Sequence, residues 1–349
     1  MNPSPELDSR KAWVLFRFPH ETNFYFLTQA DADLHRGTVG KSAGFYMAPF
    51  RHRSSEEIYI PLAGSALQRF SRDVLKDVSE PPSLYRPVVS VPDHERRVAE
   101  AIKAIRENRL LKKIVLSNRL DAEKEDCRPL AVFKRMTEKY PGAFVYYWHH
   151  PAAGGDWAGA SPELLLGYAR EKESGLFTGE TVSLAGTKLS DQNRPWTDKE
   201  REEQELVSRY IRTLLTRHRL AFSSDGPVDV RQGNLVHLKT DFTFLFQDSD
   251  LIPRLLYDLH PTPAVAGVPK KTAMEHISRL EGYDREFYTG FTGFAGPSAG
   301  RLFVNLRSMQ LHPRKVMFYA GGGITAASDP EAEWEEVKRK WNIMQSVFS

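Results

Sequence analysis

Two predicted acidic helices carry the residues best suited to chemistry in this 349-residue sequence. The first covers residues 198–219, and its apolar stripe, extended backward, includes Glu203. The stripe consists of Leu206, Val207, Tyr210, Ile211, Leu214 and Leu215. One carboxylate of this acidic run should therefore face the interior, where a carboxylate needs a cationic partner or a metal ion.

The predicted final helix, 330–347, repeats this arrangement. Glu333, Glu336 and Lys340 lie three, four and seven residues apart on a face that adjoins its apolar stripe. A small number of oxygen ligands is what Mg2+ accepts in proteins. The spacing equally allows an ordinary interpretation, in which these glutamates are solvated and pair with nearby lysines and arginines.

A lysine opens the predicted strand 113–120. Alternation of side chains puts Lys112 and Lys113 on opposite faces, so one of them faces the covered side of the sheet. A desolvated lysine can act as a base, because burial favours its neutral form. A strand-start lysine that reaches solvent remains the alternative.

Other polar residues stand in apolar surroundings. Glu163 follows two small residues in ASPELLL, and Arg307 is the lone charge in the predicted strand LFVNLRSMQL, where a guanidinium favours a bidentate anion. The glycines 321–323 predict a turn before the final helix that could approach an anion closely, or an ordinary tight turn. His237 and His260 fit structural roles as well as catalytic ones.

Composition excludes several classes of protein. Hydrophobic residues make up 41% and charged residues 27%, as in globular domains, and the 48 basic and 45 acidic residues leave a net charge of +3, so we expect no nucleic-acid partner. Cys127 is the only cysteine, which rules out an intrachain disulfide. The sequence has neither a signal-peptide pattern nor a membrane-spanning stretch, and we expect a cytoplasmic protein with no membrane partner.

Strand and helix patterns alternate along the whole chain. Hairpin-length connections between short strands favour an α+β fold, with large antiparallel β-sheets layered with flanking helices. LFVNLRSMQL and KVMFYAGGGI are predicted to pair as neighbouring strands. Because no linker marks a boundary, we predict a single catalytic domain over residues 1–349, with an N-terminal sheet portion (1–90) and a motif-bearing portion (91–349).

The order of motifs from about residue 112 onward resembles the chorismate-utilising enzymes. The motifs are KKIVLS, ASPELLL, SLAGTK, KEREEQELV, HPTPAVAG, VPKKTAM, YTGFTGF, LRSM, YAGGGI and SDPEAEWEEVKRK. They cover about two thirds of the chain. The resemblance implies the α+β fold of that family and the substrate chorismate.

The resemblance also implies roles for individual residues. Lys113 matches the base that activates water, and Glu163 matches the acid that protonates the departing hydroxyl. Glu203 and Glu336 match ligands of Mg2+, with Glu333 close by. The residues that match substrate-binding positions are Gly186, Thr187, His237, Ala264, Arg307, Gly321, Gly322, Gly323 and Lys340.

Within this family the residues favour an isochorismate synthase, an isomerase. Lys113 stands where ammonia-using anthranilate synthases typically lack a base, and Ala185 stands where aminodeoxychorismate synthases usually carry a lysine nucleophile. Water is therefore the expected nucleophile, and we expect a monomer with no obligate glutaminase subunit. A salicylate synthase and a non-catalytic chorismate-binding relative are the alternatives. The product could serve menaquinone, siderophore or salicylate biosynthesis.

Overall fold

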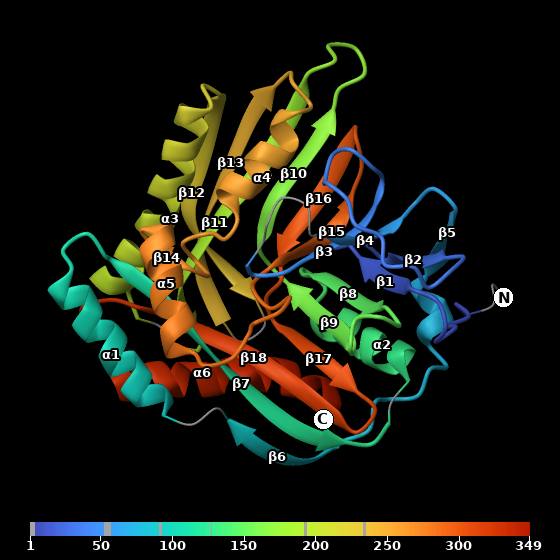
Figure 1. Cartoon of the computed structure of the whole chain (residues 1–349), viewed down its shortest axis with the longest axis horizontal. Helices are drawn as coiled ribbons and strands as arrows, with labels where there is room; N and C mark the ends of the chain where they lie inside the picture. Colours follow the sequence, from blue (N-terminus) through green and yellow to red (C-terminus); the bar gives the residue numbers. More distant parts are fainter. Residues whose placement is uncertain (1–3, 52–56, 91–92, 127, 192–193, 233–234) are drawn as a thin grey trace.

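The computed structural model describes residues 4–51, 57–90, 93–126, 128–191, 194–232 and 235–349. Cys127 lies outside these residues. The described residues form two large antiparallel sheets and six α-helices (Figure 1), so the predicted α+β class is confirmed. No helix among them is both long and apolar enough to cross a membrane.

The larger sheet has ten strands within the described chain. In spatial order they are β14 (Gly267–Val268), β7 (Lys113–Lys124), β18 (Lys315–Ile324), β17 (Ser308–His312), β9 (Asp156–Ser161), β8 (Phe144–His149), β1 (Trp13–Arg17), β2 (Asn23–Gln29) and β5 (Ser65–Ser71), with β6 (Leu84–Ser90) also paired to β7. The long strand β7 thus stands beside β18, and both contribute to the site described below.

The smaller sheet has eight strands within the described chain. Their order is β12 (Ala221–Gln232), β13 (Leu235–Phe246), β11 (Phe177–Leu189), β10 (Leu164–Arg170), β16 (Ala299–Val304), β15 (Phe291–Ala295), β3 (Gly44–Ala48) and β4 (Ile58–Pro61). The strands of the predicted N-terminal portion are divided between the two sheets, because β1, β2 and β5 extend the larger one and β3 and β4 the smaller one.

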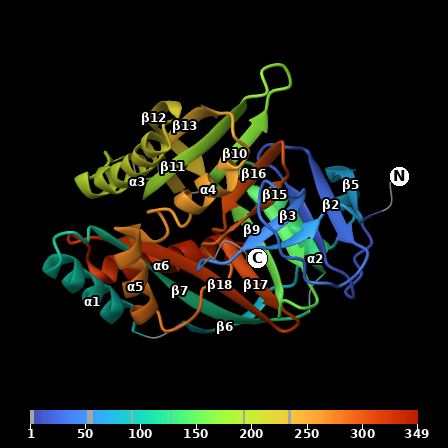
Figure 2. The same cartoon turned by 45° about the horizontal axis from the view of Figure 1, so that its top comes forward.

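The helices cover the outer faces of the sheets. They are α1 (His94–Glu107), α2 (Pro129–Lys139), α3 (Asp198–Arg217), α4 (Leu251–Leu259), α5 (Lys270–Leu280) and α6 (Pro330–Gln345), with short 3-10 helices at Arg72–Leu75 and Ser346–Phe348. The helices α3 and α4 pack on the smaller sheet, and α2 and α6 on the larger one. Figure 2 shows these two halves one above the other.

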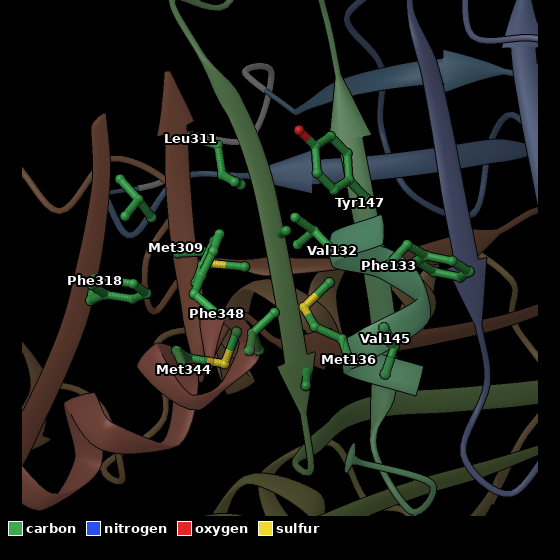
Figure 3. Close-up of a cluster of buried hydrophobic side chains, with 14 of the residues drawn as sticks. Val132, Phe133, Met136, Val145, Tyr147, Met309, Leu311, Phe318, Met344 and Phe348 are labelled. Atoms are coloured by element: carbon green, nitrogen blue, oxygen red, sulfur yellow. The ribbon is translucent and has the colours of Figure 1, made fainter. Parts of the chain in front are cut away.

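Strand β8 shows how the sheets share one interior. Its residues Phe144, Tyr146 and Trp148 belong to the apolar core between the two sheets. The alternate residues Val145 and Tyr147 point the other way, into the core beneath α2 and α6 (Figure 3). Since both faces are covered by apolar layers, the chain forms a four-layer α–β–β–α arrangement.

One predicted strand is divided between the two sheets. The stretch LFVNLRSMQL ends β16 of the smaller sheet and then begins β17 of the larger one, with residues 305–307 between them. The prediction of a single strand was wrong. The residues on both sides of 305–307 are buried, so the apolar pattern gives no sign that the chain passes from one sheet to the other. The predicted pairing with 315–324 is confirmed only for β17.

A buried ion pair joins the strands and loops on which the site is built. Arg285 donates to Glu281 through Nε (2.8 Å to Oε2) and Nη2 (2.5 Å to Oε1), and their side chains are 1% and 2% exposed. The same guanidinium donates to the carbonyl of Val115 in β7 at 2.7 Å, to the carbonyl of Val265 at 2.9 Å and to Thr289 Oγ1 at 3.1 Å. Three segments distant in sequence are therefore held by one side chain.

We predict that Arg285→Met lowers the free energy of unfolding by about 3–5 kcal/mol, because the buried Glu281 carboxylate loses its counterion. Urea unfolding followed by circular dichroism measures this. The matched control is Arg96→Met, which removes an exposed pair of the same sequence spacing (Arg96–Glu100, 64% and 46% exposed) and should cost less than about 1 kcal/mol. Equal losses in the two variants would contradict the prediction.

Candidate active site

A cavity of about 130 Å3 lies between the two sheets and is lined by parts of β11, β13, β18, α3 and α6. The predicted site residues that line it are Glu163, Gly186, Thr187, Glu203, His237, Ala264, Arg307, Gly321, Gly322, Gly323, Glu336 and Lys340. Lys113 does not line the cavity but contacts Glu203, which does. Glu333 lines an adjoining cavity. The fold therefore gathers the predicted residues in one place.

Lys113 is fully buried at the start of β7, and its Nζ donates to Glu203 Oε1 at 2.7 Å. Glu203 lies near the start of α3, which begins with a capping box between Thr197 and Glu200. A Cβ atom at Gly323 would lie 2.4 Å from Glu203 Oε1 and 2.6 Å from Lys113 Cε. The contact between lysine and glutamate therefore requires glycine at position 323. The prediction that one of Lys112 and Lys113 faces the covered side is confirmed, and the buried one is Lys113.

Glu163 lies in the break between β9 and β10 and is 2% exposed. Its Oε1 accepts a hydrogen bond from Thr262 Oγ1 at 3.5 Å, and its carbonyl accepts one from the Val304 amide at 3.0 Å. Burial raises the pKa of Glu163 to about 8, although the charge of Lys113 and the Thr262 hydroxyl act in the opposite direction. The carboxyl is therefore protonated at neutral pH and can donate a proton.

The three glutamates of the acidic helices that lie at the site, Glu203, Glu333 and Glu336, each have a lysine partner. Besides the pair of Glu203, Lys340 Nζ lies 2.7 Å from Glu336 Oε1, and Lys199 Nζ lies 2.5 Å from Glu333 Oε1. Burial opposes ionisation of Glu336, but Lys340 holds its pKa below the usual value, whereas burial raises the pKa of Glu333. Across the described ranges, no three His, Cys, Asp or Glu side chains are grouped as ligands of one metal ion.

Carboxylate oxygens nevertheless approach the glycines of β18 from both acidic helices. A Cβ atom at Gly322 would lie 3.1 Å from Glu333 Oε2 and 3.9 Å from Glu336 Oε1, and one at Gly323 would meet Glu203 as described above. Because glycine carries no side chain, the space between these carboxylates stays free. A few carboxylate oxygens completed by water suit Mg2+, so this donor set fits that ion.

The three glycines 321–323 do not form the predicted turn, whereas the predicted strand 315–324 that contains them is confirmed as β18. They lie within β18 and pair with residues 115–117 of β7. The prediction of a turn was wrong because glycine is compatible with a turn and with a strand. Here the neighbouring strand β7 supplies hydrogen bonds that favour the strand. The glycines let α6 come close to the sheet, where Lys340 Nζ donates to the Gly321 carbonyl at 2.9 Å.

Arg307 lies between β16 and β17, not inside a strand as predicted. Its φ is +48°, an unusual value for a residue with a side chain. The guanidinium lines the cavity, and its Nη2 donates to His237 Nε2 at 3.1 Å. Burial lowers the pKa of Arg307 to about 10, so the group stays charged at neutral pH and suits a carboxylate ligand.

Several residues around the site were not predicted. Lys199 pairs with Glu333, Thr262 contacts Glu163, and Tyr288 and Thr289 line the cavity. Thr262 and the Tyr288–Thr289 dipeptide occur within the motifs HPTPAVAG and YTGFTGF, which could have drawn attention to them. Lys199 precedes the acidic run, where a lysine is ordinarily solvated.

We predict that Glu163→Gln stabilises the protein, and that the gain grows from about pH 4.5 to about pH 8. Over this range an unfolded chain has lost the Glu163 proton while the folded protein keeps it, so the free energy of unfolding of the natural protein falls as pH rises. Glutamine does not titrate. Urea unfolding at both ends of the range measures the difference, and Glu171→Gln, on an exposed hairpin, is the control. A gain that does not change with pH would contradict the prediction.

Comparisons with known proteins agree with this geometry. A family model described as "Chorismate binding enzyme" matches residues 54–349. Isochorismate synthase EntC of Escherichia coli (strain K12) is 30% identical over 317 residues, which cover 86% of this chain and 79% of that protein. The salicylate biosynthesis isochorismate synthase of Pseudomonas aeruginosa is 30% identical over 265 residues, covering 73% and 54%.

A solved structure supports the same fold. The menaquinone-specific isochorismate synthase MenF of Escherichia coli aligns with a TM-score of 0.79 at 22% identity, over 99% of this chain and 93% of that one. The match of the family model extends over most of the chain, including every strand and helix that lines the cavity. The chain therefore belongs to the chorismate-binding enzyme family.

Proposed function

We propose that this protein is an isochorismate synthase, which converts chorismate to isochorismate reversibly with Mg2+. The observation that carries the proposal is a cavity lined by a glutamic acid that keeps its proton at neutral pH, Glu163, with a fully buried lysine, Lys113, bonded to the cavity residue Glu203. The relatives at 30% identity are named for this activity.

In the proposed reaction, Lys113 removes a proton from the water that adds to C2 of the ring. Glu163 gives its proton to the C4 hydroxyl, which leaves as water while the ring double bond shifts. One water enters and one leaves, so the product is an isomer of the substrate. Glu163 is suited to the acid role because its carboxyl is protonated at the pH of the reaction.

The charged residues around the cavity have complementary tasks. Arg307, with the backbone of 321–323, binds a substrate carboxylate. Glu203 and Glu336, with Glu333 beside them, would hold Mg2+, which would supply positive charge opposite the ring carboxylate of the substrate. Gly186, Thr187 and Ala264 shape the wall of the pocket.

Water is the proposed nucleophile because residue 185, where a lysine amine could attack the ring, is an alanine. Ala185 lines the cavity there. The proposal therefore requires no glutaminase subunit as a source of ammonia, and the protein acts on chorismate alone.

We predict that purified protein forms isochorismate from chorismate and Mg2+, and that Lys113→Ala and Glu163→Gln each lower kcat by a factor of about 10² to 10⁴, as expected for loss of one proton-transfer group. Liquid chromatography of the products measures both. Lys112→Ala is the matched control, because Lys112 precedes Lys113 but is exposed. Salicylate and pyruvate as products would establish the salicylate synthase alternative, and binding of chorismate without turnover would indicate a non-catalytic relative.

We predict that Glu203→Ala and Glu336→Ala abolish activity at every Mg2+ concentration, because each removes a proposed ligand of the ion. Titration calorimetry with Mg2+ should show the loss of binding directly, without dependence on turnover. Glu202→Ala changes an exposed neighbour on α3 and should leave both measurements unchanged. Normal magnesium-dependent turnover in either ligand variant would refute the proposed metal site.

A further inference from the structure

The hydrogen-bond partners of His237 in β13 indicate which of its two ring nitrogens carries the proton. Arg307 Nη2 lies 3.1 Å from His237 Nε2, and the opposite ring nitrogen, Nδ1, lies 3.1 Å from the carbonyl oxygen of Gly186. The Thr187 hydroxyl is 3.2 Å from the same Nδ1. Both ring nitrogens therefore have partners from other parts of the chain.

These partners permit only one neutral form of the ring. A guanidinium group can only donate hydrogen bonds, so Nε2 must accept and carries no proton. A backbone carbonyl can only accept, so Nδ1 must donate and carries the proton. The two contacts independently require the same tautomer.

Burial keeps the ring in this neutral form. His237 is 8% exposed, and burial lowers its pKa to about 3, with the charge of Arg307 acting in the same direction. The other charged groups close to the ring are Lys340 and Glu336, which oppose each other in sign. A neutral ring whose Nε2 already accepts from Arg307 has no proton to deliver into the cavity.

The strand that presents the Gly186 carbonyl is shaped for this contact. Ala185 of β11 pairs with Leu238, and Thr187 pairs with His237, so Gly186 is an extra residue in the register. Its φ of +74° is a left-handed value that glycine adopts readily. The resulting bulge puts the Gly186 carbonyl against Nδ1 of the ring.

Arg307 needs such a support because its own backbone does not provide one. The residue stands between two sheets with a φ of +48°, outside the regular pleat that directs side chains in a strand. We propose that His237 is a positioning residue: its neutral ring, protonated on Nδ1 and anchored on the Gly186 carbonyl, accepts from Arg307 and aims the guanidinium at the substrate carboxylate. The binding role of Arg307 rests on the proposed function, whereas the tautomer does not.

The tautomer can be measured in the ligand-free protein. With isotope-labelled histidine, a long-range proton–nitrogen correlation spectrum distinguishes the two neutral forms and the charged form, and the spectrum of His237→Gln identifies the signals of His237. We expect protonated Nδ1 and bare Nε2, unchanged between about pH 5.5 and 8.5. A proton on Nε2, or titration within this range, would overturn the proposal whatever reaction the enzyme catalyses.

Kinetics with chorismate then test the positioning role. His237→Ala should raise KM about tenfold or more with a much smaller change in kcat, since it weakens binding in the ground state and in the transition state alike. His237→Gln should bring KM back to within about threefold of the natural protein, because a glutamine can accept from Arg307 and donate to the Gly186 carbonyl. The pH profile of kcat should be the same in all three proteins.

A second arginine–histidine contact provides the control. Arg279 Nη2 lies 3.0 Å from His276 Nδ1 on the exposed side of α5, away from the cavity, so His276→Ala should change neither KM nor kcat. If His237 were an acid or a base, His237→Gln would lose kcat as severely as His237→Ala and would lose one limb of the pH profile. Absence of turnover in the natural protein would contradict the proposed function and leave the spectroscopic test intact.

Discussion

The arrangement of the site depends on the buried pair of Glu281 and Arg285. One guanidinium holds the carbonyl of Val115 in β7, the carbonyl of Val265 in the loop beside the acid, and the hydroxyl of Thr289. Burying two charges costs desolvation energy that their attraction only partly recovers, so such a pair contributes more to geometry than to net stability. The Glu281–Arg285 pair therefore fixes the position of β7, which begins at Lys113, relative to the segments around Glu163.

Charge at the cavity is balanced in pairs, and the glycines of β18 allow those pairs to form. Glu203, Glu333 and Glu336 each contact a lysine, and glycine at 322 and 323 leaves room for their carboxylates over the sheet. The lysines offset the repulsion between these neighbouring carboxylates, because each negative charge lies beside a positive one. The same carboxylates offer oxygen atoms of the type that Mg2+ binds.

The sequence alone predicted most elements well, because amphipathic helices and alternating strands repeat with different periods. The helices predicted at 198–219 and 330–347 are observed at Asp198–Arg217 and Pro330–Gln345. The errors fell on 302–311 and 321–323. In both places local composition fits two backbone paths, and the choice depends on which distant strand supplies the hydrogen bonds.

The ordered motifs in the sequence also indicated the family and the set of residues that meet at the cavity. Only the tertiary structure decided their chemical states. The contacts of Lys113 with Glu203, of Thr262 with Glu163 and of Arg307 with His237 join residues 90, 99 and 70 positions apart. A protonated carboxyl at position 163 and a neutral ring at position 237 both result from burial between two sheets. Residue type determines which proton a side chain can exchange, but the surroundings assembled by folding determine whether it holds that proton at neutral pH.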